Sequence, residues 1–324
     1  DYLGALWAVG LRQRASTDAT VEQALADRTI VRTWPMRGTL HFVAAEDVHW
    51  MVKLLAPRVA AGSSARHREL ELDARVFARS GELFVDALHG GKQVTRPRLY
   101  EILNAANIAT AGARGLHILG HHAQTRLICF AAREGKQQAF ALLDEWVPPP
   151  KAKERDEALA ELAARYFTGH GPATLHDFAW WSGLTLTDAR AGAELAKPRL
   201  TTASIDDRAH WFAGSPPASR ASVDRAYLLP AFDEYTVAYR DRSAVLDPSY
   251  AKRVNAGGGI FNPIMVLGGQ VVGTWKRTLT KTSVDVTFMP FKRLTKAQRE
   301  AFDTAADRYA RFLKAARRQG GKTR

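Results

Sequence analysis

Cysteine is almost absent from the sequence, and long hydrophobic runs are missing. The single cysteine, Cys129, excludes a disulfide within the 324-residue chain and is consistent with a reducing compartment, so we expect a cytoplasmic protein. No apolar run approaches the roughly 18 residues that a membrane-spanning helix needs. The opening residues also lack the basic start and apolar stretch of a signal peptide. The sequence therefore predicts no association with a membrane.

The motifs of the common nucleotide- and metal-dependent enzymes are also absent. There is no Walker A loop, no Gly-x-Gly-x-x-Gly, no Cys-x-x-Cys and no His-Glu-x-x-His. The adjacent His121 and His122 would point in different directions on a helix, so we favour helix-surface histidines over ligands of one metal ion. Residues 257–259 (GGG) resemble a hinge, because no helix start follows them to hold a phosphate. We expect neither a metal nor a cofactor.

Positive charge is abundant and unevenly spread. The net charge is +13, and from Gln270 to Arg324 there are 14 Lys and Arg against 4 Asp and Glu. A basic balance of this size favours an anionic partner, most simply nucleic acid. The alternative for the last segment is a solvated tail that only keeps the protein soluble.

In residues 1–80 the pattern of apolar and β-branched side chains predicts helices around a short stranded segment. The chain opens on apolar residues of a buried helix, and since a domain rarely starts inside its own core, we expect a segment to precede Asp1. Residues 29–34 and 39–43 are rich in β-branched and aromatic side chains and predict strands, with Pro35 and Gly38 breaking the run between them. Residues 46–55 predict a helix.

The order of elements in residues 81–147 is that of a winged helix. A helix is expected to start near Pro97, a second covers residues 116–123, and strands at 127–130 and 138–143 flank a turn. Consecutive prolines at 148–150 then predict an extended linker.

Residues 152–215 repeat that order. Helices are expected at 154–167, 175–182 and 187–195, the middle one with a capping box from Thr174 and Asp177 and an end at Gly183. Strands at 200–205 and 209–212 flank the turn at Asp206 and Asp207.

Residues 225–324 change to a β pattern. Apolar residues 227–232 are followed by strands at 264–267, 270–275 and 284–288, with a two-residue turn at 268–269. A final helix starts at Thr295 with Gln298 completing a capping box, and its outer face is basic. The fold class is α+β: tandem winged-helix modules followed by a β-rich, barrel-like domain with a terminal helix.

Two groups of side chains are candidates for contact with an anionic partner. Arg32, Arg37 and His41 surround the first stranded segment, and Arg37 beside Gly38 can approach a phosphate closely or else pair with a nearby carboxylate. Lys276 and Arg277 lie on or near a hairpin that can touch phosphates or enter a groove. The alternative for this second pair is an ordinary solvated strand end.

A third candidate group follows the apolar stretch at 227–232. Asp233, Tyr235 and Tyr239 can support a general base or orient a water, with Arg242 close by as a DNA contact. The alternative, which we favour, is a structural network that ties a turn to the strand.

Four stretches carry a resemblance to a known family: residues 32–43 (RTWPMRGTLHFV), 171–184 (GPATLHDFAWWSGL), 228–235 (LLPAFDEY) and 271–275 (VVGTW). Together they resemble the winged-helix DNA-binding family that contains the AlkZ-like and YcaQ-like DNA glycosylases, over essentially the whole chain. The resemblance implies three tandem winged helices and a β-rich domain around a DNA-binding concavity. It also implies excision of alkylated bases, crosslinked ones included, without a cofactor.

The family's catalytic motif, Gln-x-Gln or Gln-x-Asp, lies just before a stretch that resembles residues 1–7. We therefore assign no catalytic residue and expect that motif upstream of Asp1. The partner implied is double-stranded DNA, and we expect a monomer. Two other hypotheses stay open: a non-catalytic DNA-binding protein or regulator, and a scaffold whose wings bind protein.

Overall fold

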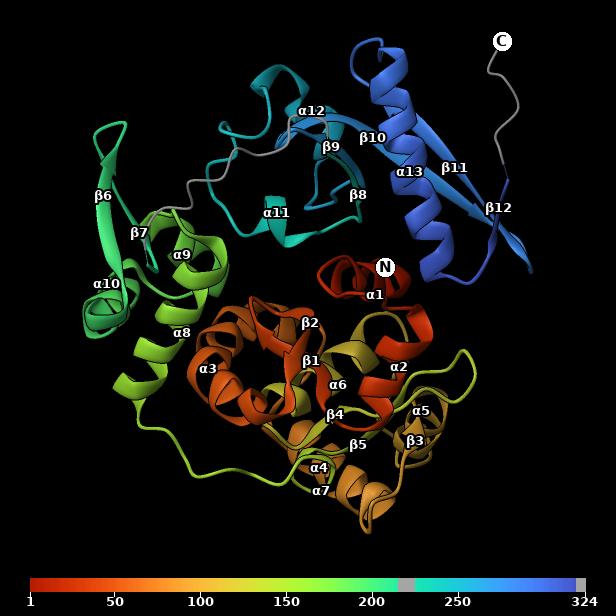
Figure 1. The fold of residues 1–324 in the computed structure, drawn as a ribbon. Coiled ribbons are helices and arrows are strands. Elements are labelled where there is room, and N and C mark those ends of the chain that lie inside the picture. The colour runs from red at the N-terminus through yellow and green to blue at the C-terminus, as the bar shows by residue number, and fades with distance from the viewer. Residues whose placement is uncertain (215–224, 319–324) are drawn as a thin grey trace. The chain divides into compact units, whose positions relative to one another are not determined.

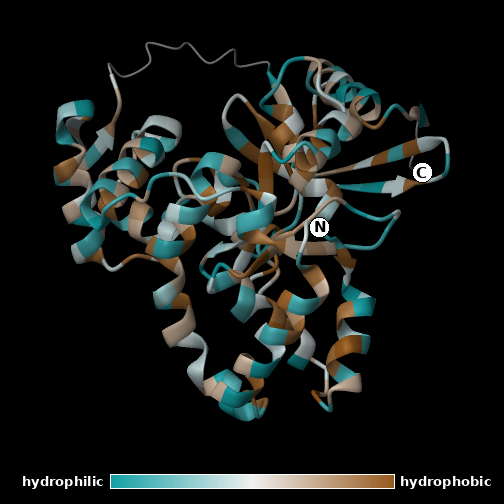
Figure 2. Ribbon diagram, turned by 90° about the horizontal axis from the view of Figure 1, so that it is seen from below, coloured by the Kyte–Doolittle hydropathy of each residue, from teal (hydrophilic) through white to brown (hydrophobic). Residues whose placement is uncertain are grey.

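The computed structural model describes residues 1–214 and 225–318 and has a mixed α+β fold (Figure 1). The chain forms two compact units, one of residues Gln23–Ser215 and one that joins Asp1–Glu22 to Pro216–Arg324. Among the described helices, none has both the length and the apolar character needed to cross a membrane. Most helices in Figure 2 carry brown and teal residues in alternation, as expected for helices that bury one face.

A five-stranded sheet lies within the unit of residues Gln23–Ser215. Its order is β2-β1-β4-β5-β3, with β1 at Ile30–Met36, β2 at Thr39–Ala44, β3 at Val94–Thr95, β4 at Ile128–Phe130 and β5 at Ala139–Leu142. Both hairpins expected from the sequence are present, and a pairing between Arg32 and Phe130 joins them into one sheet. Pro35 does not break the first strand but lies within β1, where the register with β2 shifts between Thr33 and Met36.

Helix α3, Ala45–Glu69, is much longer than the helix expected at residues 46–55. It continues through Pro57, which removes one backbone donor. Its fully buried face, which includes Val52, Leu55 and Ala56, ends just before that proline, and beyond it the ring of His67 still packs 5.1 Å from that of Phe77. This face packs against β1 in one hydrophobic cluster with Val31. The predicted helix end at residue 55 was wrong, because the low helix propensity of Pro57 did not end a helix that makes tertiary contacts on both sides of it.

The second and third sections contain the expected helices. They are α5 (Arg96–Ala105), α6 (Arg114–Gln124), α8 (Arg155–His170), α9 (Leu175–Ser182) and α10 (Leu186–Leu195). Three further elements were not expected from the sequence: α4 (Ala74–Leu88), α7 (Leu143–Trp146) and the 3-10 turn η1 (Lys197–Arg199). The Thr174–Asp177 capping box at the start of α9 is confirmed, as is the left-handed Gly183 at its end. Strands β6 (Thr201–Ile205) and β7 (Arg208–Phe212) form a separate hairpin whose turn holds Asp206 and Asp207 at positive φ.

The other unit is built on a second five-stranded sheet with the order β12-β11-β10-β9-β8. Its strands are β8 (Ala226–Leu229), β9 (Ile264–Leu267), β10 (Gln270–Leu279), β11 (Ser283–Pro290) and β12 (Ala316–Arg318). The Gly268–Gly269 turn is confirmed, and β10 and β11 form a longer hairpin than expected. Its helical elements are α11 (Glu234–Val237), η2 (Pro248–Tyr250), α12 (Ala251–Val254) and α13 (Lys296–Phe312), whose Thr295–Gln298 capping box is confirmed.

Helix α1, Tyr2–Leu11, packs within this second unit, and α2 follows at Asp18–Ala26. The Trp7 indole donates to the carbonyl of Leu228 at 2.7 Å, and its ring lies 5.0 Å from both Tyr309 and Phe312. Gly10 lies so close to the Phe312 ring that a Cβ there would stand 2.3 Å from it. The first helix is thus tied to the C-terminal part of the chain, an association that the sequence did not indicate. The division into three winged-helix regions and a fourth domain stays a prediction.

Candidate nucleic-acid interface

Arg37 lies at the turn between β1 and β2, beside an open depression of about 330 Å³. Arg37 and Gly38 both have positive φ, 53° and 69°, which lets the chain reverse in two residues. Arg58 of α3 lies on the same depression, and the lining contains these two cations and no acidic residue. We call this feature the arginine pocket; its lining residues are Arg37, Gly38, Leu55, Arg58, Val59, Gly62, Ser63, Ser182 and Gly183.

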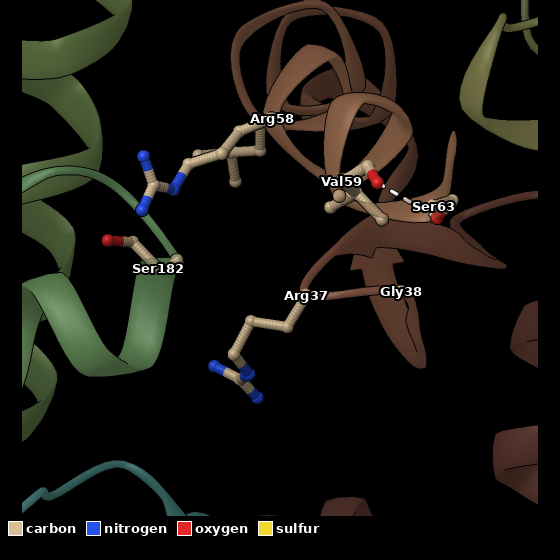
Figure 3. Close-up of a pocket in the computed structure, with 9 residues that line it drawn as sticks. Arg37, Gly38, Arg58, Val59, Ser63 and Ser182 are labelled. Carbon is tan, nitrogen blue, oxygen red and sulfur yellow. Dashed lines mark hydrogen bonds between the residues drawn. The ribbon is translucent and has the colours of Figure 1, made fainter. Parts of the chain in front are cut away.

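Three elements shape the arginine pocket. In Figure 3, Arg58 of α3 extends toward Ser182 at the end of α9, whereas the Arg37 side chain extends away from α3, so the two guanidinium groups point in different directions. The hairpin lies close to α3: a Cβ built on Gly38 would be 3.3 Å from the Cγ1 of Val59. The hairpin lies equally close to the end of α9: a Cβ built on Gly183 would be 3.2 Å from the Cγ of Arg37. Both glycines also have positive φ, so side chains there would add strain to crowding.

The hydroxyl groups of the arginine pocket donate to the protein itself. Ser63 donates to the carbonyl of Val59 at 2.9 Å, and Ser182 donates to the carbonyl of Phe178 at 2.7 Å (Figure 3 shows the first of these bonds). The charged donors of the pocket are therefore the two guanidinium groups. Arg58 is exposed, and among the described residues no hydrogen bond or ion pair engages it.

Arg58 was not singled out by the sequence, because the helix that carries it was expected to end at residue 55. Its charge reaches Asp188, whose pKa is lowered first by a hydrogen bond from Arg155 and to a smaller extent by Arg58. Asp188 accepts from Arg155 at 2.8 Å and from Thr185 at 2.8 Å, so it is occupied at the start of α10. A helix pattern extended past Pro57 would have been the signal for Arg58.

Arg32 and His41 are not part of the arginine pocket. Arg32 is half-buried in β1, donates to the side chain of Gln138 and lies 4.5 Å from the centre of the Phe130 ring. His41 is half-buried on β2, with its Nε2 at 2.8 Å from the Thr39 hydroxyl. These contacts with Gln138 and Phe130 hold the Arg32 side chain against the sheet. Its role as a DNA contact stays a prediction.

Asp233 is the centre of a buried network in the other unit. Arg12 donates to both of its carboxylate oxygens, at 2.8 and 3.0 Å, and Asp233 also accepts from the backbone N–H of Tyr235 at the start of α11. These hydrogen bonds raise the pKa of Arg12 above its ordinary value. The Asp233 side chain is fully buried, which matches the structural alternative considered from the sequence.

Tyr235, Tyr239 and Arg242 surround the same turn. The Tyr235 hydroxyl donates to the carbonyl of Gly269, and burial raises the pKa of Tyr235. Arg242 donates to the carbonyl of Thr236 at 2.6 Å and lies 5.2 Å from the centre of the Phe261 ring. Tyr239 is half-buried just beyond α11. All three lie in the unit that contains Asp233.

Lys276 and Arg277, neighbours on β10, have different surroundings. Lys276 is exposed, whereas the Arg277 side chain is only 17% exposed and forms two 2.7 Å bonds to the carboxylate of Asp1. Asp1 is itself the N-cap of α1, where it accepts from the N–H of Gly4. Arg277 therefore fastens the start of α1 to β10, and only Lys276 of the pair presents its charge outward.

The two adjacent histidines are packing residues, which corrects the surface location expected for them. His122 is 4% exposed and lies 2.8 Å from the Ser80 hydroxyl, and His121 stacks on Phe77 at 3.7 Å. Burial lowers the pKa of His121 to about 4 and that of His122 to about 3. One hundred degrees of helix turn separate the neighbours, so His122 faces the core when His121 meets Phe77. Over residues 1–214 and 225–318 no group of three potential metal ligands is found.

A basic balance of charge and a pocket lined by two arginines are features common among proteins that bind anionic polymers. The chain belongs to the family described as "DNA glycosylase AlkZ-like", whose model matches residues 4–312. It is similar to an interstrand DNA cross-link repair glycosylase of Streptomyces sahachiroi, with 26% identity over 288 residues, which cover 83% of this chain and 76% of that protein.

The fold has a solved counterpart in the Streptomyces sahachiroi DNA glycosylase AlkZ. The TM-score is 0.75 at 22% identity, covering 97% of this chain and 88% of that one. At this identity the likeness concerns the fold, and it agrees with the mixed α+β class expected from the sequence. The tandem winged-helix interpretation stays a prediction.

Proposed function

We propose that the protein is a DNA repair glycosylase that hydrolyses the N-glycosidic bond of alkylated bases, including those in interstrand crosslinks. The observation that carries the proposal is the family match over residues 4–312, supported by the name of the cross-link repair relative. The net charge of +13 is consistent with a DNA substrate, double-stranded in this proposal. We further propose that it acts in the cytoplasm as a monomer.

The reaction is a hydrolysis that needs no outside electron donor or acceptor. Alkylation at a purine N7 makes the base cationic and weakens its bond to C1′ of the sugar. That bond breaks with its electron pair going to the base, which leaves neutral, while water adds to C1′ and gives up one proton. The protein's tasks are to position the water and to stabilise positive charge on the sugar.

We expect the catalytic residues of the hydrolysis to lie next to the start of α1. The family's glutamine motif precedes a stretch like residues 1–7, and here Asp1 caps α1 and is fastened by Arg277. Trp7 anchors the same helix on Leu228. We propose that this attachment would hold such a motif in a fixed direction, so the protein to assay is one in which the motif is present.

The test is release of base from DNA that carries N7-alkylguanine. Protein with its upstream residues is incubated with the duplex, and abasic sites are detected by strand cleavage in alkali. We expect abasic sites above the spontaneous background, and their absence with a protein that binds the duplex would overturn the enzymatic claim. If a Gln-x-Gln or Gln-x-Asp motif precedes Asp1, a variant in which its two outer residues are changed to alanine is the matched control.

A non-catalytic DNA-binding protein is the second candidate. It is favoured if the two positions of the upstream motif are neither Gln nor Asp, because no amide or carboxylate would then be present to hold the water. A protein-binding scaffold predicts a DNA affinity that hardly changes with salt, whereas contacts to phosphates weaken steeply as salt rises.

A further inference from the structure

We propose that the arginine pocket binds one phosphodiester group of a DNA backbone, held between Arg37 and Arg58. The inference rests on the proposed function only in taking DNA as the source of the phosphate. Two arginines on separate elements meet at one depression whose lining has no acidic residue. Arginine suits this task because its planar donors match the oxygens of a phosphate.

The construction of the arginine pocket leaves room for a ligand group above the backbone. Gly38 and Gly183 both border it, at positive φ and with close neighbours on α3 and Arg37. A volume of about 330 Å³ is at the lower end of the range for small-molecule sites, about 300–1,000 Å³. It is open to solvent, as a site for one group of a long polymer must be.

The hydrogen-bond inventory identifies a charged ligand. The Ser63 and Ser182 hydroxyls donate to Val59 and Phe178, so neither hydroxyl hydrogen is left for a ligand, whereas among the described residues no hydrogen bond engages the Arg58 guanidinium. Asp188 feels the charge of Arg58 but already binds Arg155 and Thr185. The two non-bridging oxygens of a phosphodiester, which share one negative charge, match such a set of donors.

The first experiment measures affinity for an undamaged duplex as a function of salt. Arg58→Gln removes the exposed charge, and Lys53→Gln is the matched control, because Lys53 is also exposed on α3 but lies about 140° around the helix from Arg58. We expect Arg58→Gln to weaken binding about fivefold to tenfold at low salt and to reduce the salt slope by about one. We expect Lys53→Gln to change neither, and equal behaviour of the two variants would overturn the proposal.

The second experiment uses the single native cysteine as a silent background. Cys129 is fully buried, so Arg58→Cys and Lys53→Cys each present one accessible thiol. Each variant is mixed with a duplex that carries a tether on an internal phosphate ending in a pyridyl disulfide. The cysteine thiolate attacks the tether sulfur and displaces pyridine-2-thione, whose release is followed. We expect Arg58→Cys to crosslink several times faster than Lys53→Cys, and equal rates would contradict a backbone contact here.

A free anion is the alternative source of the same chemistry. Inorganic phosphate is titrated against the protein while its melting temperature is followed. Saturable stabilisation that is lost in Arg58→Gln, together with unchanged DNA affinity in that variant, would assign the pocket to a free anion and overturn the proposal. Because none of these assays measures base release, a protein that binds through Arg58 but releases no base would contradict only the proposed glycosylase activity.

Discussion

The pair between Arg12 and Asp233 offers a prediction with a defined size. Arg12→Met removes both hydrogen bonds to a carboxylate whose side chain is fully buried, while the Arg12 side chain is 49% exposed. Breaking a buried pair costs about 3–5 kcal/mol, because the remaining charge has lost its partner. Since water can reach the Arg12 side of the pair, we expect the low end, about 3 kcal/mol.

The assay is thermal unfolding of Arg12→Met, Asp233→Asn and the double variant. For a unit of this size a loss of about 3 kcal/mol lowers the melting temperature by roughly 10 °C. Asp233→Asn removes the buried charge itself, so the double variant should be more stable than the sum of the two single losses predicts, by about 1.5 kcal/mol or more. A shift below about 2 °C for Arg12→Met, or strict additivity, would refute the reasoning.

Three further predictions concern single side chains. In the unfolded chain His122 binds a proton near pH 6.5, whereas in the folded protein burial lowers its pKa to about 3. The free energy of unfolding should therefore decrease by up to about 5 kcal/mol as the pH is lowered from 6.5 to 3. His122→Asn should flatten this part of the plot of melting temperature against pH. Phe232 has φ of 61° and a half-exposed ring, so Phe232→Gly should leave stability in denaturant unchanged or raise it by about 1 kcal/mol. Cys129 should not react with a thiol reagent until denaturant is added, because burial raises its pKa and blocks access.

Features set by neighbouring residues could be predicted from the sequence. Both capping boxes are present, at Thr174 and at Thr295, because such a motif needs only four consecutive residues. The Gly268–Gly269 turn was identified for the same reason. These elements depend on the backbone preferences of a few neighbouring residues, which can be read from the sequence alone.

Features that depend on distant residues could not be predicted. Arg12 and Asp233 are 221 positions apart, and Arg277 meets Asp1 across 276 positions. Nothing in the composition around Arg277 distinguishes a fastened arginine from a free one. The arginine pocket likewise arises only when the β1–β2 turn, α3 and the end of α9 come together, and Arg58 belongs to it only because α3 continues past Pro57.

The net charge therefore overstates the surface that is free to meet DNA. Arg317 is held by Asp303 and Asp307 of α13, so reversing its charge tests the attachment of β12 more than a basic tail, and Arg277 is held by Asp1. Reversing the charge of either arginine would disturb folding first, so neither variant separates DNA affinity from stability. Arg58 and Lys276 are exposed cations that form no ion pair with any described carboxylate, so at these positions a change in DNA affinity can be separated from a change in stability.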